Sequence, residues 1–303
     1  MKDDGSKNIA AYTPDERKPI RIFAEDCPIV AAVHVTLNGT NDTSVTRTHA
    51  NNGNVEINYI IDGETIPGGK WPLSVFAKVQ DACGGLVRAD STVSSTFRFV
   101  YEIPFNNPET DNPNGIHLGS RDSIELWFDD MNAAAAFDAA TLTVKAVPGE
   151  SVMDYLHFFG SSNEMLASGG QYNENLPCKN IDMLLIELSS GGTAPDPIGF
   201  IKRGQVFDDL KGEWKYLVDR TRGRYQLESA PATEYILWNF SRKNPQGYVG
   251  NTKLSYVGAG SGTLYWYAIG RIPVKQMRTD ASARTVAVKQ AALSTMVANA
   301  RSV

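Results

Sequence analysis

Histidines are the first side chains to consider for acid–base or metal chemistry. The sequence holds four of them, His34, His49, His117 and His157. Their spacing contains no His-x-x-x-His or similar ligand pair. His34 also lies inside an alternating apolar segment that is typical of a strand. We therefore expect each histidine to have a structural role.

Paired carboxylates are the second candidates, because two acids across a cleft are sufficient for glycan hydrolysis. Such pairs occur at Asp129-Asp130, at Asp208-Asp209 and at Glu109 with Asp111. The pair at 208–209 precedes a predicted helix, where the helix dipole favours acids. The pair at 129–130 ends a predicted strand, where acids are common in turns. We predict no catalytic residue among them.

The loop 106–122 is the best candidate for a metal site. Its oxygen-bearing side chains are Asn106, Asn107, Glu109, Asp111, Asn112 and Asn114. They lack the Asp-x-Asp-x-Asp-Gly pattern of a calcium loop. The sequence also has no Gly-x-Ser-x-Gly elbow, no phosphate-binding Gly-x-x-x-x-Gly-Lys loop and no dinucleotide fingerprint. We predict no metal and no cofactor.

Composition and charge disfavour several classes of protein. Lys and Arg number 29 against 34 Asp and Glu, which gives a net charge of −5 and disfavours a surface built to neutralise phosphates. Cys27, Cys83 and Cys178 form no Cys-x-x-Cys pair, so we interpret them as buried thiols. The N-terminal residues lack the apolar core of a secretory signal. We expect a globular protein that folds where it is made.

Short apolar or alternating runs must position these side chains, and they are typical of β-strands. The first half contains 20–24, 30–37, 55–61, 97–105, 124–128 and 142–147. The second half contains 181–188, 198–201, 235–240, 253–257 and 264–272. The 26 Gly and 15 Pro, with many Asn and Ser between the runs, indicate an all-β protein with long loops.

Helices are predicted at three places. The first starts at Trp71-Pro72 and ends before Gly84, because proline suits a first helical turn and glycine suits a helix end. The second covers 209–220, where apolar residues recur on one face. The third begins at Thr279-Asp280 and continues to the C-terminus without Pro or Gly. We expect the third helix either to pack on its own domain or to contact a neighbouring subunit or lipid.

The two halves repeat the same order of segments, which predicts an internal duplication. The matched segments are 33–40 with 185–193, 97–103 with 235–240, 124–128 with 253–257 and 142–147 with 264–269. Gly69-Lys70-Trp71 also matches Gly212-Glu213-Trp214 at the predicted helices. About eight short strands per copy with a helix between them predict two tandem jelly-roll β-sandwiches.

We predict four parts in this chain. They are an N-terminal arm at 1–19, a first jelly roll at 20–150, a second jelly roll at 151–278 and a C-terminal helix at 279–303. The arm is predicted because its mixed charges and two prolines show no strand or helix period. The boundary near 150 is predicted because 148–180 is rich in Gly, Ser and Asn.

Within this predicted layout of two jelly rolls, one family of viral proteins is resembled by two segments, Phe97–Phe105 and Val206–Leu217. The chain is similar to the double jelly-roll major capsid proteins of tailless icosahedral phages with an internal membrane. The corticovirus type and the lipid-containing Flavobacterium phage are the members it resembles. The resemblance covers nearly the whole chain and rests on architecture rather than on a diagnostic motif.

That resemblance implies a structural protein of the virion and not an enzyme. It implies homotrimers that form pseudo-hexameric tiles of an icosahedral shell, assembled in the host cytoplasm. The N-terminal arm and the C-terminal helix would join neighbouring trimers, penton or minor capsid proteins and the lipid of the internal membrane. Direct contact with nucleic acid is not implied.

Two other classes of protein remain open from the residues alone. One is a secreted two-domain jelly-roll glycan hydrolase, which would need a processed leader and two acids across a cleft. The other is a carbohydrate-binding protein with exposed aromatic side chains or loop-bound calcium. Trp127, Trp238, Trp266 and Tyr267 suit either interface anchors or strand cores, and we expect core packing for them.

Overall fold

The computed structural model describes parts of both halves of the chain. The described residues are 7–12, 19–41, 52–82, 89–93, 96–105, 114–129, 137–153, 155–176, 181–189, 198–202, 205–207, 234–239, 252–258 and 260–273. The helices predicted at 209–220 and after residue 279 lie outside these residues. Within them, no helix is long and apolar enough to cross a membrane.

The first half folds into two sheets that face each other. Its strands are Lys7–Tyr12 (β1), Ile20–Phe23 (β2), Ile29–Asn41 (β3), Asn54–Ile61 (β4), Glu64–Pro72 (β5), Ala89–Val93 (β6), Thr96–Pro104 (β7), Asn114–His117 (β8), Ser123–Asp129 (β9) and Phe137–Pro148 (β10). One sheet has the order β1-β10-β3-β7-β6, and the other contains β5-β4-β9-β2. β6 and β8 are additions to eight principal strands, which have the order of a jelly roll.

The second half repeats this order. Its strands are Tyr155–Met165 (β12), Gln171–Asn175 (β13), Ile181–Leu188 (β14), Ile198–Lys202 (β15), Gln205–Phe207 (β16), Glu234–Asn239 (β17), Thr252–Val257 (β18) and Thr263–Pro273 (β19). The short strand Ser151–Val152 (β11) connects the halves and pairs with β8. In both halves one sheet takes principal strands one, eight, three and six, and the other takes two, seven, four and five.

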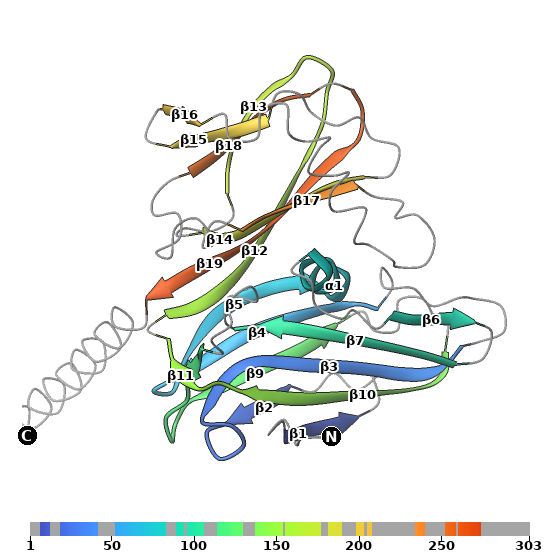
Figure 1. Cartoon of the computed structure of the whole chain (residues 1–303), viewed down its shortest axis with the longest axis vertical. Helices are drawn as coiled ribbons and strands as arrows, with labels where there is room; N and C mark the ends of the chain where they lie inside the picture. Colours follow the sequence, from blue (N-terminus) through green and yellow to red (C-terminus); the bar gives the residue numbers. More distant parts are fainter. Residues whose placement is uncertain are drawn as a thin grey trace, which may run out of the picture.

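The duplication predicted from the sequence is confirmed strand by strand. β3 and β14 are the third principal strands, β7 and β17 the sixth, β9 and β18 the seventh, and β10 and β19 the eighth. These are the four pairs of segments that the sequence matched. Figure 1 shows the two halves at opposite ends of the view, with the helix Leu73–Ala82 (α1) where they meet.

Three segments differ from the sequence predictions. Residues 1–19 were expected to be an arm, but they contain β1, which pairs along β10 as the first strand of its sheet. No strand was predicted in the Gly-, Ser- and Asn-rich stretch 148–180, but it contains β12 and β13. Gly69-Lys70-Trp71 was placed at a helix start, but it belongs to β5, and α1 begins at Leu73. Edge strands with polar exposed faces, such as β13, carry too little apolar alternation to be seen in a sequence.

Alternating burial produces the core of the first half. Val33, Val35 and Leu37 of β3 are fully buried, and they point toward the facing sheet. The strand β14 is different, because every residue from Ile181 to Leu188 is buried. A strand buried on both faces needs cover on both sides. The first half of the chain provides the second cover.

Candidate functional site: the contact between the two halves

The two halves share one continuous sheet. β5, an edge strand of the first half, pairs in parallel with β12 through Gly69 and Phe159. The resulting sheet has the order β17-β14-β19-β12-β5-β4-β9-β2 and crosses the boundary between the halves (Figure 1). Gly69 has φ +101°, and a Cβ there would lie 2.0 Å from the carbonyl oxygen of Phe159. Only glycine lets the two strands approach this closely.

Aromatic side chains fill the contact around this strand pair. The ring of Phe159 lies 5.2 Å from Trp71 and 5.4 Å from Phe76, which is on α1. Trp71 also lies 5.8 Å from Tyr267 of β19 and donates a hydrogen bond from Nε1 to the carbonyl oxygen of Gly160 at 2.9 Å. Such ring pairs add to the stabilisation from buried area. The core of the first half therefore continues into the second.

The sheet β12-β19-β14 presents its two faces to two different cores. Met183, Leu185 and Ile269 belong to the core cluster of the first half. On the opposite face, Trp266 lies 6.4 Å from Tyr256 of β18 inside the second half. This arrangement explains the continuous apolar run of β14, which a strand with one wet face would not show.

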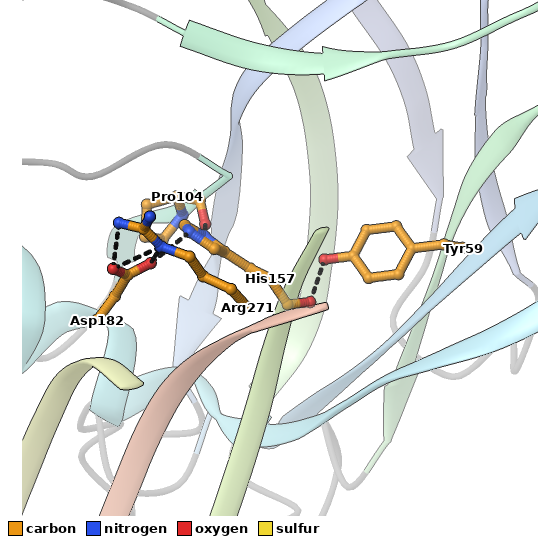
Figure 2. Close-up of polar contacts among 5 residues, drawn as sticks. All are labelled: Tyr59, Pro104, His157, Asp182 and Arg271. Atoms are coloured by element: carbon orange, nitrogen blue, oxygen red, sulfur yellow. Dashed lines mark hydrogen bonds and ion pairs between the residues drawn. The ribbon is translucent and has the colours of Figure 1, made fainter. Parts of the chain in front are cut away.

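A buried group of charged side chains lies at the same contact (Figure 2). Asp182 lies at the start of β14, and its Oδ2 accepts a hydrogen bond from Arg271 Nε at 2.7 Å. Its Oδ1 forms an ion pair with Arg271 Nη2 at 2.6 Å. Its Oδ2 also lies 3.4 Å from His157 Nε2. Arg271 stacks over the ring of Tyr155 at 4.3 Å. His157, Asp182 and Arg271 come from β12, β14 and β19, respectively.

His157 connects this group to the first half. Its Nδ1 lies 3.2 Å from the carbonyl oxygen of Pro104, and a carbonyl only accepts, so Nδ1 donates that hydrogen bond. Its own carbonyl oxygen accepts a hydrogen bond from the Tyr59 hydroxyl at 2.7 Å (Figure 2). β4, β7 and β12 are thereby tied together. The side chain of His157 is only 1% exposed, so no substrate in solution reaches it.

The electrostatics of this group favour an ionised Asp182. Burial raises the pKa of the Asp182 carboxyl, but the hydrogen bonds and the attraction from His157 and Arg271 outweigh burial, and the pKa ends below its ordinary value. Burial also raises the pKa of the Tyr59 hydroxyl well above its ordinary value. Tyr59 is therefore a neutral hydrogen-bond donor at physiological pH.

A second ion pair crosses the contact at the helix. Lys78 of α1 binds Glu187 of β14, and both side chains are largely buried, at 15% and 10% exposure. Glu187 lies on the face of β14 that carries Met183 and Leu185. The helix is thus fixed to the outer face of the second half's sheet by a charge pair as well as by Phe76.

The structure describes some of the side chains that the sequence singled out. His34 lies 3.1 Å from Glu102 on the surface of the first sheet, and His117 is exposed on β8. Asp129 pairs with Lys70 at 2.9 Å. His49, Asp130 and the acids at 109, 111, 208 and 209 lie outside the described residues. The absence of a catalytic residue stays a prediction.

The structure describes some of the tryptophans and cysteines for which the sequence predicted burial. Trp266 is 1% exposed and packs in the core, as expected, and Cys27 is a buried thiol. Trp127 is half-buried and donates a hydrogen bond from Nε1 to Glu125 Oε1 at 2.6 Å. Cys83, Cys178 and the side chain of Trp238 lie outside the described part of the chain.

The sequence contains one signal for the buried charges. Asp182 and Glu187 are acids inside the apolar run 181–188. Acids are rarely buried without a cationic partner, so such a run implies an Arg or Lys nearby in space. Nothing in the sequence says which one, because Arg271 is 89 residues from Asp182.

No protein-family model and no curated protein matches the chain. The crystal structure of the STIV MCP matches with a TM-score of 0.63 and 12% identity, over 88% of this chain and 96% of that one. The major capsid protein P2 from bacteriophage PM2 matches with a TM-score of 0.53 and 14% identity, over 88% of this chain and 97% of that one. The chain has a double jelly-roll fold.

A third match supports the same fold. A chain from the atomic structure of Sulfolobus turreted icosahedral virus gives a TM-score of 0.60 at 12% identity, over 88% of this chain and 90% of that one. This chain and each of the three matched structures correspond over most of their lengths. Identity this low shows the fold, and function must be argued from the molecule itself.

Proposed function

We propose that this double jelly roll is the major capsid protein of an icosahedral virus and works by self-association. The observation that carries the proposal is the duplicated strand order, with both jelly rolls fixed to each other by a buried contact. The fold of two viral major capsid proteins over most of both chains supports it. A protein of this kind needs contact surfaces and no active site.

The duplication gives a physical reason for the assembly. Three copies of a chain with two similar jelly rolls make a closed ring with threefold symmetry and a nearly sixfold outline. Such a ring tiles a shell like a hexamer, while each chain keeps two different surfaces. A rigid contact within the chain is required, because a flexible one would not hold the outline. The shared sheet and the charges around Asp182 supply that rigidity.

We further propose where the parts of the chain begin and end and which partners they contact. The four parts are residues 1–19, 20–150, 151–278 and 279–303, with β1 at 7–12 joining the first sheet. Contacts between trimers, penton or minor capsid proteins and the lipid of an internal membrane involve the two ends of the chain. The net charge of −5 supports a protein that does not bind the genome directly. Assembly takes place in the host cytoplasm, and the protein resides in the virion.

The mass of the purified protein in solution tests this proposal. Size-exclusion chromatography with light scattering should give three times 33.1 kDa, because obligate interfaces bury roughly 2,000 Å² or more and survive dilution. Negative-stain electron microscopy of the same fraction should show particles with a hexagonal outline. A monomer at micromolar concentration, with no larger species, would overturn the proposal.

A further inference from the structure

The contact within the chain provides a template for the contact between chains. In it, the fifth principal strand of the first jelly roll, β5, lies beside the first principal strand of the second, β12. The helix after β5 then covers the outer face of β12, β19 and β14 through Phe76 and Lys78. One jelly roll therefore offers an edge and a helix, and the next offers an edge and a sheet face.

Counterparts of these edges and of this face occur once more in the two jelly rolls, without a partner in the described structure. β16 is the fifth principal strand of the second jelly roll, and it ends its sheet. β1 is the first principal strand of the first jelly roll, and among the described strands it ends its sheet. The outer face of β10, β3 and β7 corresponds to the face of β19, β14 and β17. In a ring, each of these elements from one copy meets the next copy.

We propose that the edge of β1 and the outer face of β10, β3 and β7 bind the second jelly roll of a neighbouring copy. In this contact β16 of one copy lies beside β1 of the next, as β5 lies beside β12 within the chain. The inference rests on the proposed function and deepens it, because it names the surface and the occupant. The occupant is a second copy of this chain, since only a jelly roll repeats the contact already present.

The chemistry of this face fits an interface that forms after folding. Its central strand carries His34, Thr36 and Asn38, which are only half-buried. The neighbouring rows hold Lys145, Thr143 and Thr141 on β10 and Glu102, Val100 and Arg98 on β7. The corresponding face in the second jelly roll carries Met183, Leu185 and Ile269, which are buried.

This difference has a physical cause. A contact within one chain forms during folding and does not have to face water, so most of its side chains can be apolar. A contact between folded copies starts from two wetted surfaces, and polar residues keep such a surface soluble before assembly. A polar face in the place of an apolar one is therefore expected where one copy meets another.

Substitution of one exposed threonine tests the surface. Thr141 is exposed on the outer face of β10, and Thr141→Arg places a long cation in the proposed contact. Thr65 is also exposed on a strand, but it lies on β5 near the turn at Asp62-Gly63, and Thr65→Arg is the matched control. We expect Thr141→Arg to run at the mass of one chain and Thr65→Arg to stay trimeric. Thermal melting verifies that both variants fold.

The outcomes separate the two proposals. A trimeric wild type with a trimeric, folded Thr141→Arg overturns this surface and leaves the proposed function standing. A monomeric wild type overturns the proposed function itself.

A lysine cross-link gives a second reading that does not depend on any substitution. Lys7 begins β1, and Lys202 ends β15 and pairs with Gln205, the first residue of β16. In trimers mixed from isotopically heavy and light protein, we expect heavy–light cross-links between Lys7 and Lys202. Cross-links between these lysines found only within one copy would contradict the proposed neighbour.

Discussion

Asp182 is the residue whose ionisation most affects the contact between the jelly rolls. Its carboxylate is 3% exposed and holds Arg271 by two close contacts. A carboxyl whose pKa is lower in the folded state than in the unfolded state stabilises the protein at pH values above its unfolded pKa. This stability is lost as the pH falls through the folded pKa. The contact should therefore weaken in acid.

The substitution Asp182→Asn should destabilise the protein at neutral pH by about 3 kcal/mol, because it leaves the Arg271 charge buried without its partner. The variant should also lose less stability than the wild type between neutral pH and acid. Urea unfolding at several pH values measures both effects. Asp129→Asn is the control, since Lys70 is 46% exposed and such pairs contribute roughly 0–1 kcal/mol. Equal losses in the two variants would contradict the role given to Asp182.

At the scale of elements, the pairing of β5 with β12 depends on Gly69. Gly63 is its natural comparison, because both glycines have positive φ, at +101° and +86°. A Cβ on Gly63 meets nothing within 4 Å, whereas one on Gly69 meets the backbone of Phe159. Substitutions at the two positions therefore distinguish the cost of backbone strain from the cost of disturbing the contact between the strands.

We predict that Gly63→Ala costs about 1 kcal/mol, from the left-handed conformation alone. Gly69→Ala should cost at least twice as much, because β5 must also move away from β12. Chemical denaturation measures both, and hydrogen exchange at β12 should rise only in Gly69→Ala. A Gly69→Ala variant as stable as Gly63→Ala would show that the strands do not approach as described.

At the scale of the whole molecule, the shared core makes the two jelly rolls one folding unit. Phe159 is 1% exposed and contacts Trp71 and Phe76 of the first half. Calorimetry should therefore show one cooperative transition, with equal calorimetric and van't Hoff enthalpies, under conditions that keep the oligomeric state fixed. Two resolved transitions in the wild type would contradict a continuous core.

Phe159→Ala should lower stability by about 3–5 kcal/mol, because it removes a large side chain from the contact and leaves a cavity. It should also separate the calorimetric transition into two, since the link between the halves is weakened. Phe23→Ala is the control, because Phe23 is 42% exposed on β2 and contributes little to the core. Similar effects of both substitutions would argue against the contact as the link between the halves.

The sequence by itself determined the strands with a buried face and the order in which they repeat. β4, β9 and β14 are visible because burial of one or two faces imposes a local apolar pattern. The helix at 73–82 is visible because Pro72 and Gly84 bound it. The order of these elements in both halves was sufficient to predict two tandem jelly rolls.

Only the tertiary structure decided how the two jelly rolls meet. The pairing of Gly69 with Phe159 and of Asp182 with Arg271 joins residues that are far apart in the chain, and a local pattern does not encode such pairs. The edge strands β1 and β13 were missed for a related reason. Their conformation depends on the neighbour that they pair with, and the side chains of β13 are too little buried to mark it in the sequence.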